Sequence, residues 1–128
     1  MAETVLLQEQ VARFAPQEGI AFEEARFTAF KSGRATYPEL HFWQQSQSIV
    51  TTQTMARHAT FDWASERSRA RGWPVAIRRS GGGTVFHGQK VLCVSLMERL
   101  PAANANVDFA YHRLCDLLLA GLRDLGVE

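Results

Sequence analysis

The residues with the clearest chemical potential form one stretch, RRSGGGTVFHG, from Arg78 to Gly88. Each glycine inside ordered structure costs about 0.5–1 kcal/mol relative to alanine, so three in a row suggest that something must come close to the backbone. Exposed backbone N–H groups can form a concavity for an anion, and the planar guanidinium of arginine can bind two oxygens of a carboxylate or phosphate. The alternative is a glycine-rich hairpin with two solvated arginines and with His87 packed at the end of a strand. The stretch alone leaves both interpretations open.

Two familiar phosphate-binding loops do not match this stretch. A dinucleotide-binding fingerprint requires G-x-G-x-x-G between a strand and a helix, whereas these glycines are contiguous and a strand-like run follows. A Walker loop requires lysine and then a hydroxyl residue after its last glycine, but Gln89 displaces Lys90 by one position and Val91 has no hydroxyl. We therefore expect neither loop here.

Other reactive side chains are few. Cys93 and Cys115 each fall inside an apolar segment, so we expect reduced thiols buried as small hydrophobic groups. The pair His112-x-x-Cys115 has too few partners for a zinc site, and no metal site is expected. Lys31 is expected to stabilise the end of a helix through its dipole, and Lys90 to lie in a solvated turn.

The chain alternates between short strand-like and longer helix-like patterns. β-branched and aromatic residues predict strands, and apolar residues at helical spacing predict helices, the last of them capped by Asn106. The predicted strands are residues 4–8, 40–43, 48–52, 75–77, 84–87 and 91–97, and the predicted helices are residues 17–31, 63–71 and 107–125. The glycines therefore lie between two strands. This order predicts an α/β or α+β fold in which helices pack on a mixed, largely antiparallel sheet.

Composition sets the outer limits. A chain of 128 residues, 46% hydrophobic and 21% charged, suits one globular domain over residues 1–128. A net charge of +1 provides no general attraction for nucleic acid or an anionic membrane. No apolar run approaches the ~18 residues of a membrane span, and the N-terminus lacks a secretory pattern, so we expect a cytoplasmic protein. Trp43, Trp63 and Trp73 are expected in the core or in a pocket wall.

The stretch RRSGGGTVFHG resembles the signature loop of the lipoate-protein ligase and octanoyltransferase family, which is related to biotin protein ligase. The segment GIAFEEA from Gly19 is similar to the first helix of that family, and LHFW and SIV to its next pair of strands. The segment Gly72-Trp73-Pro74-Val75 is similar to the approach to the arginines. The resemblance extends from about Thr4 to Val127. It implies a fold like the catalytic domains of class II aminoacyl-tRNA synthetases and biotin ligases.

The resemblance also implies a reaction and a set of binding residues. Ligases of the family use ATP, with Mg, to convert lipoate or octanoate into an acyl-adenylate, and then pass the acyl group to a lysine of a lipoyl carrier domain. The carrier would be the acyltransferase subunit of a dehydrogenase complex or the H protein of glycine cleavage, and no tightly bound cofactor is implied. Arg78 or Arg79 would hold the carboxylate or the adenylate phosphate, and His87 would line the pocket. The implied binding residues are Arg78, Arg79, Ser80, Gly81, Gly82, Gly83, Thr84 and His87.

The chain departs from the family pattern at the catalytic step. The essential lysine of the ligases and the cysteine nucleophile of one transferase branch lie well beyond the glycine loop, and neither Lys31 nor Lys90 occupies that place. We therefore expect the N-terminal part of a catalytic domain, belonging to a longer enzyme or to one completed by a second chain, with no catalytic residue assigned. The alternatives are a non-catalytic accessory or sensor module that binds an acyl group or nucleotide, an ATP-independent octanoyl or lipoyl transferase, and a structural interaction domain. The ligase, octanoyltransferase and amidotransferase branches remain open.

Overall fold

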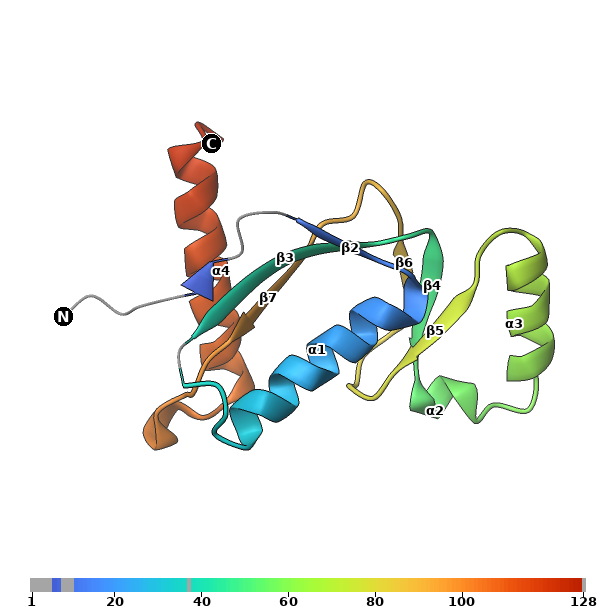
Figure 1. Ribbon diagram of the computed structural model, residues 1–128, viewed down its shortest axis with the longest axis horizontal. Coiled ribbons are helices and arrows are strands. Elements are labelled where there is room, and N and C mark those ends of the chain that lie inside the picture. Colours follow the sequence, from blue (N-terminus) through green and yellow to red (C-terminus); the bar gives the residue numbers. More distant parts are fainter. Residues whose placement is uncertain (1–5, 8–10, 37, 128) are drawn as a thin grey trace. The chain divides into compact units, whose positions relative to one another are not determined.

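The computed structural model of the protein describes residues 6–7, 11–36 and 38–127 (Figure 1). The chain divides into two compact units, Met1–Met97 and Glu98–Glu128. All the described strands belong to the first unit, together with helices α1, α2 and α3, and helix α4 belongs to the second.

The first sheet is built around β3, Glu39–Gln45 (Figure 1). The short strands β1, Leu6–Leu7, and β2, Ala12–Phe14, pair with β3 in parallel at its two ends, and β7, Cys93–Met97, pairs with it antiparallel. Trp43 of β3 therefore lies opposite both Ala12 and Cys93.

The second sheet has β4, Ser48–Thr52, at its centre. On one side β4 pairs in parallel with β5, Val75–Arg78, and on the other it pairs antiparallel with β6, Val85–His87. The glycine loop therefore connects the two outer strands across the end of β4. Because β3 and β4 each have both parallel and antiparallel neighbours, the expected mixed α/β fold with helices packed on its sheets is confirmed.

Helix α1, Pro16–Lys31, begins and ends with favourable local chemistry. Proline stands in its first turn, where it removes no helical hydrogen bond, and the backbone N–H of Ala15 donates to Glu18 Oε2 at 3.0 Å. Lys31 occupies the last turn, as expected, where its charge opposes the helix dipole.

α1 packs closely against both sheets. The ring of Phe22 stacks on Phe14 of β2, with centroids 5.1 Å apart. A Cβ atom on Gly19 would lie only 2.6 Å from Cζ3 of Trp43, so the helix needs glycine at this contact. The side chain of Gln17 donates to the carbonyl of Ile77 and accepts from its N–H, both at 3.2 Å, which fastens α1 to the outer strand β5.

Two short helices follow β4. Helix α2, Gln53–Ala56, is capped by Thr52, whose hydroxyl accepts from the N–H of Met55 at 3.3 Å. Helix α3, Phe61–Ala70, is followed by Gly72 in a left-handed conformation with φ of +83°.

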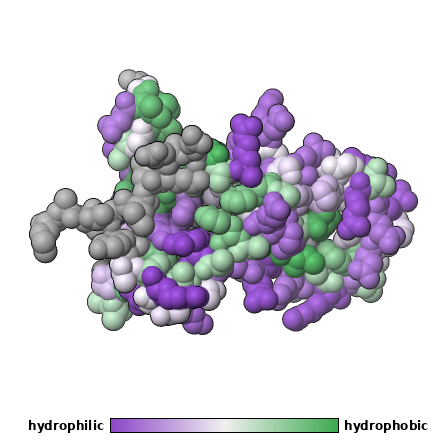
Figure 2. Space-filling view, viewed as in Figure 1, coloured by the Kyte–Doolittle hydropathy of each residue, from purple (hydrophilic) through white to green (hydrophobic). Residues whose placement is uncertain are grey.

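The core of the first unit includes Ile20 of α1, Val50 of β4 and Ala76 of β5, which are buried together. Hydrophilic side chains cover most of the face of this unit seen in Figure 2, and hydrophobic residues show between them in smaller areas.

The second unit contains a short 3₁₀ helix, Ala102–Asn104, and α4, Val107–Asp124. The side chain of Asn106 caps α4 as predicted, accepting from the N–H of Phe109 at 2.9 Å. Cys115 is exposed, so the prediction of a buried thiol is wrong at this position. The reason is geometric: Cys115 follows the partly buried Leu114 by one residue, which is about 100° around the helix.

Most predicted elements are confirmed to within two residues at their ends. Of the predicted first strand, Leu6 and Leu7 form β1, and residues 4, 5 and 8 lie outside the described residues. Three elements were not predicted: β2, α2 and the 3₁₀ helix Ala102–Asn104. No helix in the described part of the chain is long and apolar enough to cross a membrane.

Candidate functional site

Arg78 holds the glycine loop in place. It is the last residue of β5, and its Nη2 donates to the carbonyls of Gly83 at 2.6 Å and Gly81 at 3.1 Å. Its Nη1 reaches the carbonyl of Val50 on β4 at 3.5 Å. The guanidinium of Arg78 is therefore engaged with backbone carbonyls and ties the loop to the end of the second sheet.

The three glycines have different roles in this loop. Gly82 has φ of +106°, a conformation that L side chains rarely adopt, and a Cβ there would lie 2.9 Å from Nη2 of Arg78. Gly81 and Gly83 would place a Cβ in open space, with no atom within 4 Å. Gly82 is thus needed for the backbone itself, whereas Gly81 and Gly83 leave the outer surface of the loop free for close approach.

A concavity of about 330 Å³ lies between this loop and the segment after β4. Arg79, Ser80, Gly81 and Gly82 line one side of it, and the other side is formed by Thr52–Met55 and Arg57. The side chain of Arg79 is 78% exposed, and its Nε lies 3.9 Å from a carboxylate oxygen of Glu24, which is a weak ion pair. Two arginines and three hydroxyl residues therefore line one small space, which suits an anionic ligand.

His87 and Thr84 follow the glycine loop in the sequence, but they do not line this concavity. The imidazole of His87 stacks on the indole of Trp43, with centroids 6.0 Å apart and planes at 20°. Burial, and then the charge of Arg78, lower the pKa of His87, so the ring is neutral near pH 7. The hydroxyl of Thr84 is 2.8 Å from that of Thr51 on β4, which fixes the start of β6.

Cys93 faces this stacked pair. Its Sγ lies 3.5 Å from Nδ1 of His87. Burial, and then the charge of Glu23, raise the pKa of Cys93 to about 11. The thiol is therefore protonated at neutral pH and unsuited to act as a nucleophile.

A separate ionic cluster, built around the buried Glu39, joins α1 to β3. Glu39 is 3% exposed and forms a two-point hydrogen-bonded ion pair with Arg26, and its Oε2 lies 2.8 Å from Nε2 of His41. Burial raises the pKa of Glu39, but the hydrogen bonds from Arg26 and His41 outweigh it and leave that pKa below its ordinary value. The cluster fixes the helix on the sheet, and no sequence pattern pairs Arg26 with Glu39 in advance.

The structure thus brings together four of the expected binding residues, Arg79 and the three that follow it, around one concavity. Arg78 faces the backbone of the loop instead, so the geometry favours Arg79 for contact with a ligand. Arg57 was missed, because a single arginine in a polar segment carries no pattern that would mark it.

Comparison with known proteins identifies the family. Residues 15–128 match the family model described as the lipoyl protein ligase A/B catalytic domain. The chain is 33% identical over 117 residues to a protein of Aeropyrum pernix named as a lipoate-protein ligase A, and 30% identical over 113 residues to octanoyltransferase LipM of Exiguobacterium sp.. Each alignment covers 88% of this chain and 40% of the relative.

Solved structures agree on the fold. A bipartite lipoate protein ligase from Thermoplasma acidophilum, solved in a study of that ligase and its E2 lipoyl domain, aligns with 100% of this chain and 47% of its own, with a TM-score of 0.66 and 20% identity. Lipoate-protein ligase A bound with ATP aligns with 80% of this chain and 40% of its own, with a TM-score of 0.54 and 21% identity. The chain spans 32–40% of the length of the curated relatives that it matches. On its sequence and its fold, the chain belongs to the lipoyl protein ligase A/B catalytic domain family.

Proposed function

We propose that this domain binds lipoate or octanoate as an acyl-adenylate, for transfer of the acyl group to a lysine of a lipoyl carrier domain. The observation that carries the proposal is the concavity lined by Arg79 and Arg57 beside a glycine loop whose carbonyls Arg78 holds. The relatives support the ligand class, since one solved ligase is described as bound with ATP and a T. acidophilum protein, 25% identical with a TM-score of 0.52, as having bound lipoic acid.

The site would act by positioning and by charge. The exposed guanidinium of Arg79 can hold two oxygens of a carboxylate or phosphate, and Arg57 adds a second positive charge across the concavity. Because Arg78 already fixes the loop, little reorganisation is needed when the ligand arrives. The neutral ring of His87, stacked on Trp43, provides a mainly apolar surface beside the loop for the acyl chain.

The transfer step needs groups beyond those described above. Neither Lys31 nor Lys90 lines the concavity, and Cys93 is held as a thiol. We propose that residues 1–128 act as the N-terminal part of the catalytic domain and that the transfer chemistry comes from groups outside them, on the same chain or on a second one. Among the described residues no group of three or more His, Cys, Asp or Glu could hold a metal ion, so we assign no residue to the magnesium that accompanies ATP.

A second candidate is an ATP-independent octanoyltransferase, which the relative LipM favours. The two candidates differ in what they bind. A ligase site binds the adenylate more tightly than the free acid, whereas a transferase site gains nothing from the nucleotide part.

The test is calorimetric titration of the 128-residue chain with a non-hydrolysable lipoyl-adenylate analogue, with lipoate and AMP titrated separately. We expect micromolar binding of the analogue, about −8 kcal/mol, and a loss of about tenfold or more in Arg79→Ala and in Arg57→Ala. Arg13→Ala is the matched control, because Arg13 is exposed on β2 and does not line the concavity. Failure of the folded chain to bind the analogue, or equal losses in all three variants, would contradict the proposal.

A further inference from the structure

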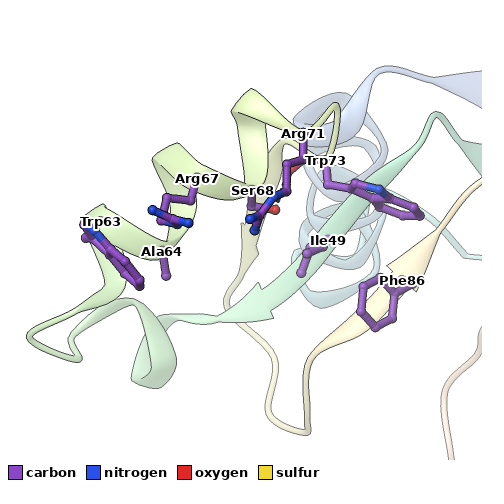
Figure 3. A pocket seen from close by; sticks show the side chains of 8 residues that line it. All are labelled: Ile49, Trp63, Ala64, Arg67, Ser68, Arg71, Trp73 and Phe86. Atoms are coloured by element: carbon purple, nitrogen blue, oxygen red, sulfur yellow. Dashed lines mark hydrogen bonds between the residues drawn. The ribbon is translucent and has the colours of Figure 1, made fainter.

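A second concavity, of about 310 Å³, lies between α3 and the second sheet and shares no lining residue with the first (Figure 3). Its apolar surface comes from Ile49 of β4, Phe86 of β6 and Trp73, and from Trp63 at the start of α3. We refer to this space as the α3 groove. Neither the glycine loop nor the proposed adenylate site makes use of it.

The aromatic side chains of the α3 groove are unusually exposed. Trp63 is 63% exposed and Phe86 is 64% exposed, although both are large and apolar. Phe86 is nevertheless held in place, because Trp73 packs against it edge to face with centroids 5.6 Å apart. Ordered aromatic rings that remain in water are typical of surfaces that another molecule covers.

Arg67 of α3 and Arg71, directly after the helix, give the groove a positive charge. The guanidinium of Arg67 lies over the ring of Trp63, 5.0 Å from its centroid, and Arg71 lines the groove one turn further along. Within the described part of the chain neither arginine forms an ion pair with a carboxylate. The acidic residues of the helix, Asp62 and Glu66, do not line the groove. The charge on this face is therefore not neutralised by the protein itself.

We propose that the α3 groove is a docking site for a segment of another protein in which an apolar side chain stands between carboxylates. The apolar side chain packs against Trp63, Trp73 and Phe86, and the carboxylates pair with Arg67 and Arg71. Tryptophan and arginine are the residues that most often dominate the energy of protein interfaces, and Arg67 is already oriented by its stacking on Trp63.

An acidic peptide fits this surface better than a nucleic acid does. Asp62 and Glu66 lie on the same helix, and the chain carries a net charge of only +1, so a long phosphate backbone finds little favourable field here. A short peptide with two carboxylates, by contrast, can be bound by Arg67 and Arg71 alone.

The test uses the whole chain and follows the indole N–H resonances of its three tryptophans by NMR. The probes are short synthetic peptides in which leucine, phenylalanine or tryptophan stands between two glutamates, and matched peptides with lysines in place of the glutamates. We expect saturable shifts for Trp63 and Trp73 with the glutamate peptides, while the resonance of Trp43, buried in the first sheet, stays in place. The lysine peptides should bind about tenfold more weakly or not at all.

Charge reversal locates the site. Arg67→Glu and Arg71→Glu should each weaken the glutamate peptides by about tenfold, whereas Arg69→Glu, on the same helix but outside the groove, should leave the affinity unchanged. All three positions are exposed, so the variants are expected to fold, which circular dichroism checks. The proposal is overturned if no glutamate peptide shifts Trp63 and Trp73, or if Arg69→Glu weakens binding as much as the other two. Equal or tighter binding of phenylbutyrate or of single-stranded oligouridine would also overturn it, since the groove would then be a site for small anions or for RNA.

Discussion

Replacing Gly82 with alanine should destabilise the glycine loop, whereas the same change at Gly83 should not. At Gly82 the backbone φ of +106° is strained for any residue with a Cβ, which costs about 1–3 kcal/mol. The new methyl group would also lie 2.9 Å from Nη2 of Arg78 and would displace the guanidinium from the loop carbonyls. We expect the free energy of unfolding to fall by about 2–3 kcal/mol in total. The lost hydrogen bonds contribute little to this sum because they are partly exposed.

Gly83→Ala is the matched control because it makes the same chemical change one residue away. No atom lies within 4 Å of its added Cβ, and its φ is not in the left-handed region. The control should therefore be neutral, or stabilising by about 0.4–1 kcal/mol, because alanine restricts the unfolded chain.

The assay is urea unfolding followed by tryptophan fluorescence, which reports on the first unit because all three tryptophans belong to it. The midpoint should fall for Gly82→Ala and not for Gly83→Ala, and the affinity for the adenylate analogue should fall in parallel. If the two variants share one midpoint and one affinity, then Arg78 does not hold the loop in the way described, and the argument for a preformed site fails.

Four further predictions concern the rest of the protein. Gly19→Ala should destabilise the first unit by about 1–3 kcal/mol in urea unfolding, because the close contact of α1 with the sheet leaves no room for a methyl group. Gly121 lies in α4, and a Cβ there would have no atom within 4 Å. Gly121→Ala should therefore favour the helix by about 1 kcal/mol and increase the helix content measured by circular dichroism. Because the pKa of Glu39 is lowered on folding, its contribution to stability is present above its ordinary value of 4.5 and is lost as the pH falls through the lower folded value. Glu39→Gln should therefore lower the urea midpoint at neutral pH and flatten its decline in acid; a decline as steep as that of the parent chain would contradict this. Iodoacetamide should modify the exposed Cys115 before Cys93, whose pKa is about 11, as mass spectrometry of the peptides would show; the reverse order would refute the burial of Cys93.

The sequence was sufficient to predict the elements that carry a strong period or a clear cap. Helix α4 is the best case, because its apolar spacing and the Asn106 cap specify the same start. Strand β2 was missed because it has only three residues, Ala12–Phe14, and exists through its pairing with β3. Helix α2 was missed because four residues contain no period, and the cap that Thr52 provides is seen only in the structure.

The candidate site was predictable in position but not in its division of roles. The glycine stretch marked the loop, and three of its residues line the concavity with Arg79. What the sequence could not show is that the chain returns after β4 to bring Arg57 to the same space, since that depends on the pairing of β4 with β5. Long-range pairing of this kind has no local signal.

The two adjacent arginines illustrate how one residue type serves both structure and binding. Arg78 ends β5 and pairs with Thr52 of β4, whereas Arg79 lies one residue beyond the strand. The guanidinium of Arg78 donates hydrogen bonds to the carbonyls of Val50, Gly81 and Gly83, and these bonds order the loop without any ligand. Arg79 is exposed and makes a weak contact with Glu24. The arginine that builds the loop and the arginine that is free to bind are therefore distinct, and a change at the first should act through the shape of the site, whereas a change at the second should act through its charge.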